Sequence, residues 1–125
     1  DTGKAKLIFR NYPIFQAHPQ AMQAAQAALC VYEQGGNSSY FTYHEKLFAN
    51  SESLTIENLN EWSQTQGYNI TSCLASQSSR IDILKDMDDG TKIGVKGTPS
   101  FVINGKFIEG VLPYQEFKKI LDESP

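Results

Sequence analysis

The alternation of apolar and polar positions predicts a short strand followed by a helix at the start of the chain. Residues Lys4 to Arg10 are apolar in the centre and charged at the ends, which is typical of a strand, and Asn11-Tyr12-Pro13 ends it. From His18 to Gln34 apolar residues recur every three or four positions, with Pro19 suited to the first helical position. We expect Gly35-Gly36 to end this helix.

Two more helices are expected in the middle of the chain. One runs from about Ser39 to Ala49, and its core candidates are Phe41, Leu47 and Phe48. The next starts at Thr55, an expected N-cap, and ends at Gly67. Its apolar side chains are Leu59 and Trp62.

A further helical stretch is expected before a hairpin. It opens at Ile70-Thr71, weakens near residues 76–79 and continues on helical spacing to Gly90. Residues Ser100–Asn104 and Lys106–Glu109 are expected to form a hairpin around Asn104-Gly105, a strong two-residue turn motif.

A closing helix is expected after the hairpin. Pro113 opens it, and its inward side chains are expected to be Tyr114, Phe117, Ile120 and Leu121. The order of strand, helices, hairpin and helix predicts an α/β fold with a short sheet and a large helical insertion.

Length and charge narrow the class of protein. A chain of 125 residues fits one domain and can bury a core without metal or disulfide staples. The net charge of −3 argues against nucleic acid or an anionic membrane as the main partner. No apolar run approaches the roughly 18–20 residues that a membrane span needs.

One segment carries a family resemblance. Residues 94–110 read Gly-Val-Lys-Gly-Thr-Pro-Ser-Phe-Val-Ile-Asn-Gly-Lys-Phe-Ile-Glu-Gly, and Pro113 follows. This segment resembles the C-terminal part of DsbA-like thiol-disulfide oxidoreductases, members of the thioredoxin superfamily. The resemblance extends upstream through Cys73-Leu74, Tyr43-His44-Glu45 and His18-Pro19 to the leading strand.

The resemblance implies a thioredoxin-like fold with an inserted helical domain and without the family's N-terminal βα unit. Residues 1–13 and 93–125 would form the thioredoxin-like part, and residues 14–92 the helical insertion. The family's first strand and redox helix would precede Asp1, so we expect a fragment of a longer protein. A missing N-terminal segment or a second copy in a homodimer could complete the sheet, or the sheet could close around the gap.

The resemblance also implies a substrate-binding loop made of Lys96, Gly97, Thr98 and Pro99. Pro99 would follow a cis peptide bond, and the backbone of Thr98 would pair with an extended, cysteine-containing polypeptide. Judged alone, Pro99 is better explained as an ordinary trans proline at the start of a strand.

The chain departs from the family in its cysteines. It has only two, Cys30 and Cys73, and therefore no Cys-x-x-Cys and no catalytic residue of that type. We expect the substrate-facing part of a DsbA-like thiol-disulfide oxidoreductase that is inactive alone. The alternative is a non-catalytic thioredoxin-like module that binds peptides or self-associates.

Cys30 and Cys73 have three interpretations: two buried apolar residues, a structural disulfide, or a catalytic pair. The catalytic pair is disfavoured, because rapid thiol exchange needs an accessible, electropositive site and the alanine-rich helix around Cys30 indicates burial. Some DsbA-like proteins have cysteines at both matching positions, so the resemblance favours the disulfide and a periplasmic or otherwise extracytoplasmic location. A zinc site with His18 and His44 would have enough ligands, but the close ligand pairs of zinc motifs are absent. We therefore expect no metal and no cofactor.

Overall fold

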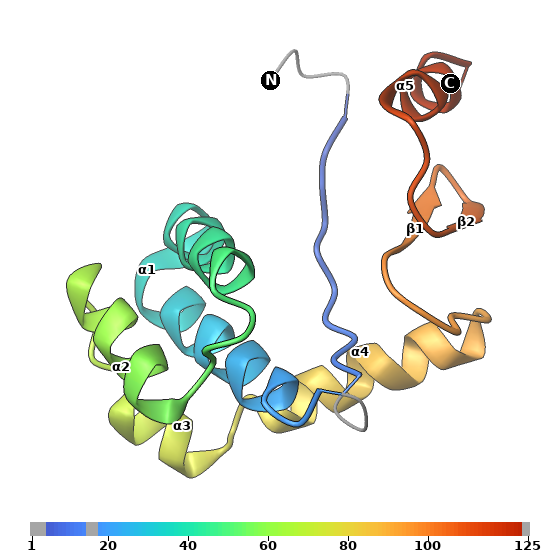
Figure 1. The fold of residues 1–125 in the computed structure, drawn as a ribbon. Coiled ribbons are helices and arrows are strands. Elements are labelled where there is room, and N and C mark those ends of the chain that lie inside the picture. The colour runs from blue at the N-terminus through green and yellow to red at the C-terminus, as the bar shows by residue number, and fades with distance from the viewer. Residues whose placement is uncertain (1–4, 15–17, 124–125) are drawn as a thin grey trace. The chain divides into compact units, whose positions relative to one another are not determined.

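The computed structural model describes residues 5–14 and 18–123 and contains helices and one hairpin (Figure 1). Its elements are α1 (Ala21–Ala49), α2 (Ile56–Thr65), α3 (Thr71–Ser76), α4 (Arg80–Lys92), β1 (Ser100–Ile103), β2 (Lys106–Glu109) and α5 (Tyr114–Glu123). The chain divides into two compact units. We call Asn11–Met87 the helical unit, and Asp1–Arg10 with Asp88–Pro125 the hairpin unit.

Helix α1 is interrupted at Gly36, the second residue of the glycine pair that was expected to end it. Gly36 has φ 77° and ψ −166°, which breaks the helical geometry, and helical backbone resumes directly after it. The positive φ suits glycine, because a side chain is strained there. The helix begins at Ala21, three residues later than the predicted start at His18. His18 belongs to the turn before the helix, where its carbonyl accepts a hydrogen bond from the Ala21 N–H at 2.9 Å.

The core of the helical unit forms where α1 packs on α2 and α3. Small side chains of α1 allow close approach, and the Tyr43 hydroxyl donates a buried hydrogen bond to the Leu59 carbonyl at 2.7 Å. The buried residues of this cluster are Ala24, Ala27, Ala28, Cys30, Val31, Tyr40, Tyr43, Leu47, Leu59, Ile70 and Leu74.

The start and end of α2 confirm two sequence predictions. The Thr55 hydroxyl accepts a hydrogen bond from the Asn58 N–H at 3.1 Å, which makes Thr55 the N-cap. Gly67 follows the helix with φ 98°, as expected for a glycine that ends a helix.

The break between α3 and α4 lies at the predicted position. Gln77 adopts the left-handed conformation with φ 55° after α3, and α4 starts at Arg80. Helix α4 passes through Gly90 to Lys92, so the prediction that it ends at Gly90 is wrong by two residues. A glycine lowers helix propensity by only about 1 kcal/mol, and the neighbouring turns tolerate that cost.

Strands β1 and β2 form an antiparallel hairpin in the hairpin unit. The register pairs Ser100 with Glu109 and Ile103 with Lys106. Asn104 and Gly105 have φ values of 50° and 86°, as a two-residue turn with both central residues at positive φ requires. The ring centroids of Phe101 and Phe117 lie 4.8 Å apart, which packs α5 against β1.

Other expectations for the sheet and core are wrong. Residues 5–10 belong to no strand, and Lys4 lies outside the described residues. The sheet of the described part has the two hairpin strands only. Phe48, Tyr114 and Leu121 are exposed where core packing was expected.

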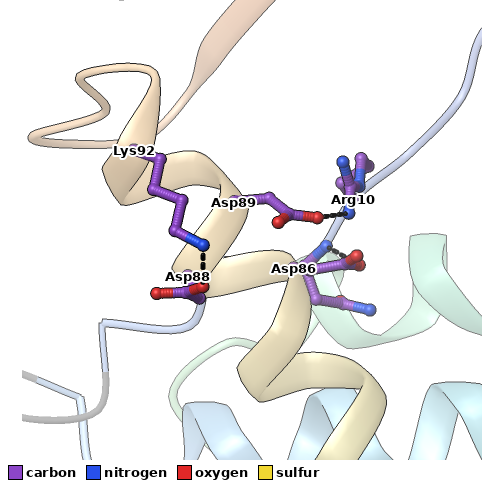
Figure 2. Close-up of polar contacts among 6 residues, drawn as sticks. Arg10, Asp86, Asp88, Asp89 and Lys92 are labelled. Carbon is purple, nitrogen blue, oxygen red and sulfur yellow. Dashed lines mark hydrogen bonds and ion pairs between the residues drawn. The ribbon is translucent and has the colours of Figure 1, made fainter.

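Arg10 and Asn11 make polar contacts with α4. Figure 2 shows the contact of Arg10 with Asp89. The Arg10 guanidinium lies 2.8 Å from the Asp89 carboxylate, and the Asn11 N–H donates to the Asp86 carboxylate at 3.2 Å. The Arg10–Asp89 pair is exposed to solvent, so its net stabilisation is small, under about 1 kcal/mol.

Candidate functional site

The predicted substrate-binding residues form one exposed loop between α4 and β1. Gly94 has φ 98°, and the Val95 N–H donates to the Gly90 carbonyl at 3.0 Å, so the chain turns sharply away from α4. Lys96, Thr98 and Pro99 are exposed to solvent. Gly97 between them is partly exposed.

Two hydrogen bonds set the shape of this loop. The Ser100 hydroxyl donates to the Gly97 carbonyl at 2.7 Å, and the Gly110 N–H donates to the Pro99 carbonyl at 2.9 Å. The second bond continues the hairpin ladder by one pair beyond Ser100 and Glu109. The peptide bond between Thr98 and Pro99 is cis.

The backbone of Thr98 is left unpaired by this arrangement. Within residues 5–14 and 18–123, neither its N–H nor its C=O makes a backbone hydrogen bond. Backbone groups of this kind in a solvent-exposed segment are available to an extended peptide, which needs a donor and an acceptor in alternation.

A groove of about 360 Å³ lies elsewhere in the hairpin unit. It runs between β2 and α5, and it includes none of residues 96–99. Its lining residues are Lys106, Phe107, Ile108, Leu112, Glu116, Lys119 and Ile120. The candidate peptide loop therefore does not line this groove.

Cys30 and Cys73 form a disulfide, and they are the only cysteines of the chain. Their Cα atoms lie 5.9 Å apart, and the bond ties α1 to α3 within the helical unit. Cys30 is completely buried, whereas Cys73 is partly exposed. The disulfide removes both thiolates from the zinc set that was weighed above, and the described part contains no cluster of three potential metal ligands.

The structure adds Glu33 to the neighbourhood of this disulfide. A carboxylate oxygen of Glu33 lies 3.6 Å from the Cys73 sulfur, which in a disulfide has no proton to donate. Sequence reasoning gave Glu33 no role. The available clue was helical spacing, since a residue three positions after Cys30 lies on the same helix face.

His44 lies among aromatic rings on α1. Its ring centroid is 6.0 Å from Tyr40, 5.9 Å from Phe41 and 4.6 Å from Phe48. Burial lowers the pKa of His44, and the charge of Glu45 acts in the opposite direction. Burial also raises the pKa of Tyr40 to about 12, against the lowering effect of its hydrogen bond with Asn11. These groups are neutral packing partners near pH 7.

Comparison with known protein families identifies the family of this chain. The family model described as Thioredoxin matches residues 1–123. The chain therefore belongs to the thioredoxin family. The helices and the two-stranded sheet of the described part are compatible with an α/β thioredoxin-like fold.

The chain is also similar to curated proteins that are named as sodium–proton antiporters. The chain is 28% identical over 117 residues to "Na(+)/H(+) antiporter NhaA 3" of Salinispora tropica, covering 91% of this chain and 17% of that protein. It is 27% identical over 109 residues to "Na(+)/H(+) antiporter NhaA 1" of Salinispora arenicola, covering 85% of this chain and 16% of that protein. The chain thus spans about a sixth of the length of these relatives.

Two further observations complete the comparison. No solved structure matches the chain. Within the residues that the structure describes, every helix is too short or too polar to cross a bilayer.

Proposed function

We propose that this chain is the substrate-facing part of a DsbA-like thiol-disulfide oxidoreductase, which exchanges disulfides with extended, cysteine-containing polypeptides. The observation that carries the proposal is the exposed loop directly before the hairpin, in which the Thr98 backbone has no backbone hydrogen-bond partner among the described residues. Membership of the thioredoxin family supports it. The redox Cys-x-x-Cys of such an enzyme is not among residues 1–125, so activity would require that pair in addition.

In the proposed mode of binding, a peptide strand lies along residues 96–99. The Thr98 N–H donates to a peptide carbonyl, and the Thr98 carbonyl accepts from a peptide N–H. Pro99 contributes no N–H, and its carbonyl is already bonded to Gly110. We assign the pairing with the peptide to Thr98, because its N–H and C=O both lack a backbone hydrogen-bond partner among the described residues and it directly precedes Pro99.

The proposal extends to organisation and location. Residues 14–92 would be a helical insertion into a thioredoxin-like part of residues 1–13 and 93–125, and the division into two compact units near residues 10 and 88 supports this. An extracytoplasmic location is supported by the Cys30–Cys73 disulfide, because such bonds persist in oxidising compartments. Finding both thiols reduced in the native host, after trapping by alkylation, would contradict that location.

The antiporter names of the relatives describe proteins in which the match covers only 16–17% of the length. Sodium–proton exchange is not proposed for this chain.

Enzyme activity tests the first half of the proposal. Residues 1–125 are compared with a form that includes the residues encoded upstream, in an assay of disulfide reduction in insulin. We expect no activity from residues 1–125 and activity from the extended form. Activity in residues 1–125 alone, or an upstream segment without Cys-x-x-Cys, would contradict the proposal.

Peptide binding tests the second half. An extended peptide with an S-methylated cysteine is titrated while backbone amide resonances are recorded, so that binding is seen without exchange. We expect the shifts to centre on residues 96–99. Thr98→Pro removes the donor and should weaken binding about tenfold, the equivalent of ~1.4 kcal/mol. The matched variant Lys106→Ala, at the far end of the hairpin, should stay within about twofold of the unchanged protein.

A second candidate function is a non-catalytic module that binds peptides or self-associates. It is favoured by the fact that both cysteines of the chain are already joined to each other. The same two experiments separate the candidates, because this module would bind the peptide but give an inactive extended form.

A further inference from the structure

The disulfide of the helical unit is asymmetric in its access to solvent. Cys30 lies on the inner face of α1 and is 0% exposed, while Cys73 on α3 is partly exposed. A dissolved thiol attacks a disulfide at a sulfur that it can reach. In the folded protein that sulfur is Cys73.

The accessible sulfur also carries a charged neighbour. The Glu33 carboxylate lies 3.6 Å from the Cys73 sulfur, and Glu33 itself is exposed, so an arriving thiol meets this side chain at the surface. Glutamate side chains are negative at neutral pH. The attacking species in thiol exchange is a thiolate, which is also negative. Glu33 therefore raises the barrier for the approach of any anion to Cys73.

We propose that Cys73 is a thiol-exchange site at which Glu33 selects against anionic thiols and in favour of thiols whose thiolate is balanced by an ammonium group. The inference is independent of the proposed oxidoreductase function, because it concerns the Cys30–Cys73 bond and not the loop at residues 96–99. It assigns a role to Glu33 that the packing of the helical unit does not require.

The proposed exchange at Cys73 takes place in two steps. A small-molecule thiolate attacks the Cys73 sulfur and forms a mixed disulfide, while the Cys30–Cys73 bond breaks. Cys30 leaves with the electron pair and takes up a proton, because burial in apolar surroundings disfavours its thiolate. A second molecule of the thiol then attacks the mixed disulfide. The small thiol is oxidised to its own disulfide, and the protein is reduced to Cys30 and Cys73 thiols.

The pair of probes that tests this selection is glutathione and cysteamine. The glutathione thiolate carries a net negative charge, whereas the ammonium group of cysteamine balances its thiolate. The oxidised protein is mixed with an excess of each thiol at equal thiolate concentration. Samples are quenched by alkylation and the rates are measured by mass spectrometry.

Glu33→Gln is nearly isosteric and removes only the charge. We expect it to speed the reaction with glutathione about fivefold, the effect of repulsion between unit charges about 4 Å apart at the dielectric constant of water. The cysteamine rate should change less than about twofold, since its net charge is zero. The matched variant Glu45→Gln removes another exposed carboxylate of the same helix and should leave both rates within about twofold.

Three results would overturn the proposal. Equal acceleration of both thiols by Glu33→Gln would mean that the variant loosens the packing. Unchanged rates in that variant would mean that Glu33 does not act on the attacking thiol. Failure of both thiols to react with the folded protein would mean that Cys73 is not an exchange site.

The position of the mixed disulfide gives a separate check. Peptide mapping of samples trapped early should place glutathione on Cys73 and the alkylating group on Cys30. The opposite placement would contradict the assignment of the attacked sulfur, whatever the rates.

Discussion

The helical unit and the hairpin unit differ in how completely they enclose apolar side chains. In the helical unit Val31, Tyr43, Leu59 and Ile83 are 0% exposed. In the described part of the hairpin unit, Ile108 is the one buried hydrophobic residue, at 8%. Leu7, Ile8, Val111 and Tyr114 of that unit are each more than two-thirds exposed.

The difference shows where stability and the candidate function lie. The helical unit has a closed core and a covalent cross-link, so its stability comes from burial and chain constraint. A two-stranded sheet with little apolar cover is only marginally stable by itself. The candidate peptide loop thus belongs to the unit with the smaller core, where local opening costs least free energy.

Removal of the disulfide tests how far the cross-link accounts for this difference. The double variant Cys30→Ala, Cys73→Ala should lower the free energy of unfolding by about 4 kcal/mol, as expected for a loop of this length in the chain-entropy model. Urea titration followed by the fluorescence of Trp62, the single tryptophan, measures the change in the helical unit. Amide exchange of β1 and β2 should stay the same, and equal loss of protection in both units would break the comparison.

Matched truncations test the role of the core. Leu59→Ala removes a completely buried side chain and should destabilise the protein by about 3 kcal/mol. Val102→Ala, on β1, acts at a side chain that is 56% exposed and should cost less than about 0.5 kcal/mol. Both are measured by urea denaturation, and similar costs at the two sites would show that burial does not distinguish the units.

Gly35→Ala probes the tightness of packing in the helical unit. A Cβ at Gly35 would collide with the hydroxyl groups of Tyr68 and Ser39, which share a hydrogen bond of 2.7 Å. We expect a loss of about 2 kcal/mol from overpacking, against the small gain that alanine gives an open helix position. A thermal melt that moves upward would contradict this, because it would mean that α1 and residue 68 separate easily.

The smallest expected effect is the pH dependence that His44 adds to the helical unit. Burial lowers its pKa in the folded state below the ordinary value of 6.5, so folding favours the neutral ring. The stability from that preference is complete above about pH 6.5 and is lost as the pH falls through the lowered pKa. The urea midpoint should therefore fall more steeply below neutral pH in the unchanged protein than in His44→Gln, and parallel slopes would contradict the prediction.

Local motifs made much of the fold predictable. The Thr55 cap, the stop at Gly67 and the Asn104-Gly105 turn each depend on a few neighbouring residues, and each lies where the sequence placed it. The two helical runs at residues 18–34 and 39–49 were also recognisable, although Gly36 only interrupts α1. Such features are encoded by backbone preferences that act within one turn.

The pairing of strands and the burial of individual side chains were harder to predict, because both depend on residues that are distant in the sequence. Residues 5–10 have an apolar centre, but a strand needs a partner, and nothing within the segment specifies one. Phe48 follows the buried Leu47 by one position, and adjacent helical residues point about 100° apart, so the exposure of Phe48 required knowledge of where α2 packs.

The same distinction between local and distant residues applies to the candidate site. The four residues of the loop at 96–99 are contiguous, so the sequence alone brought them together. The approach of Glu33 to Cys73 joins residues 40 positions apart and depends on the fold of the helical unit. It could be seen only once α1 and α3 were placed against each other.

The Cys30–Cys73 bond also makes a covalent ring of the residues between the two cysteines. That ring contains the exposed turn at Ser51, Glu52 and Ser53. If a protease cuts this turn, the two fragments stay joined by the Cys30–Cys73 disulfide and by the packing of the core. The nicked protein would keep its size on a gel without reductant and separate into two bands when reductant is added.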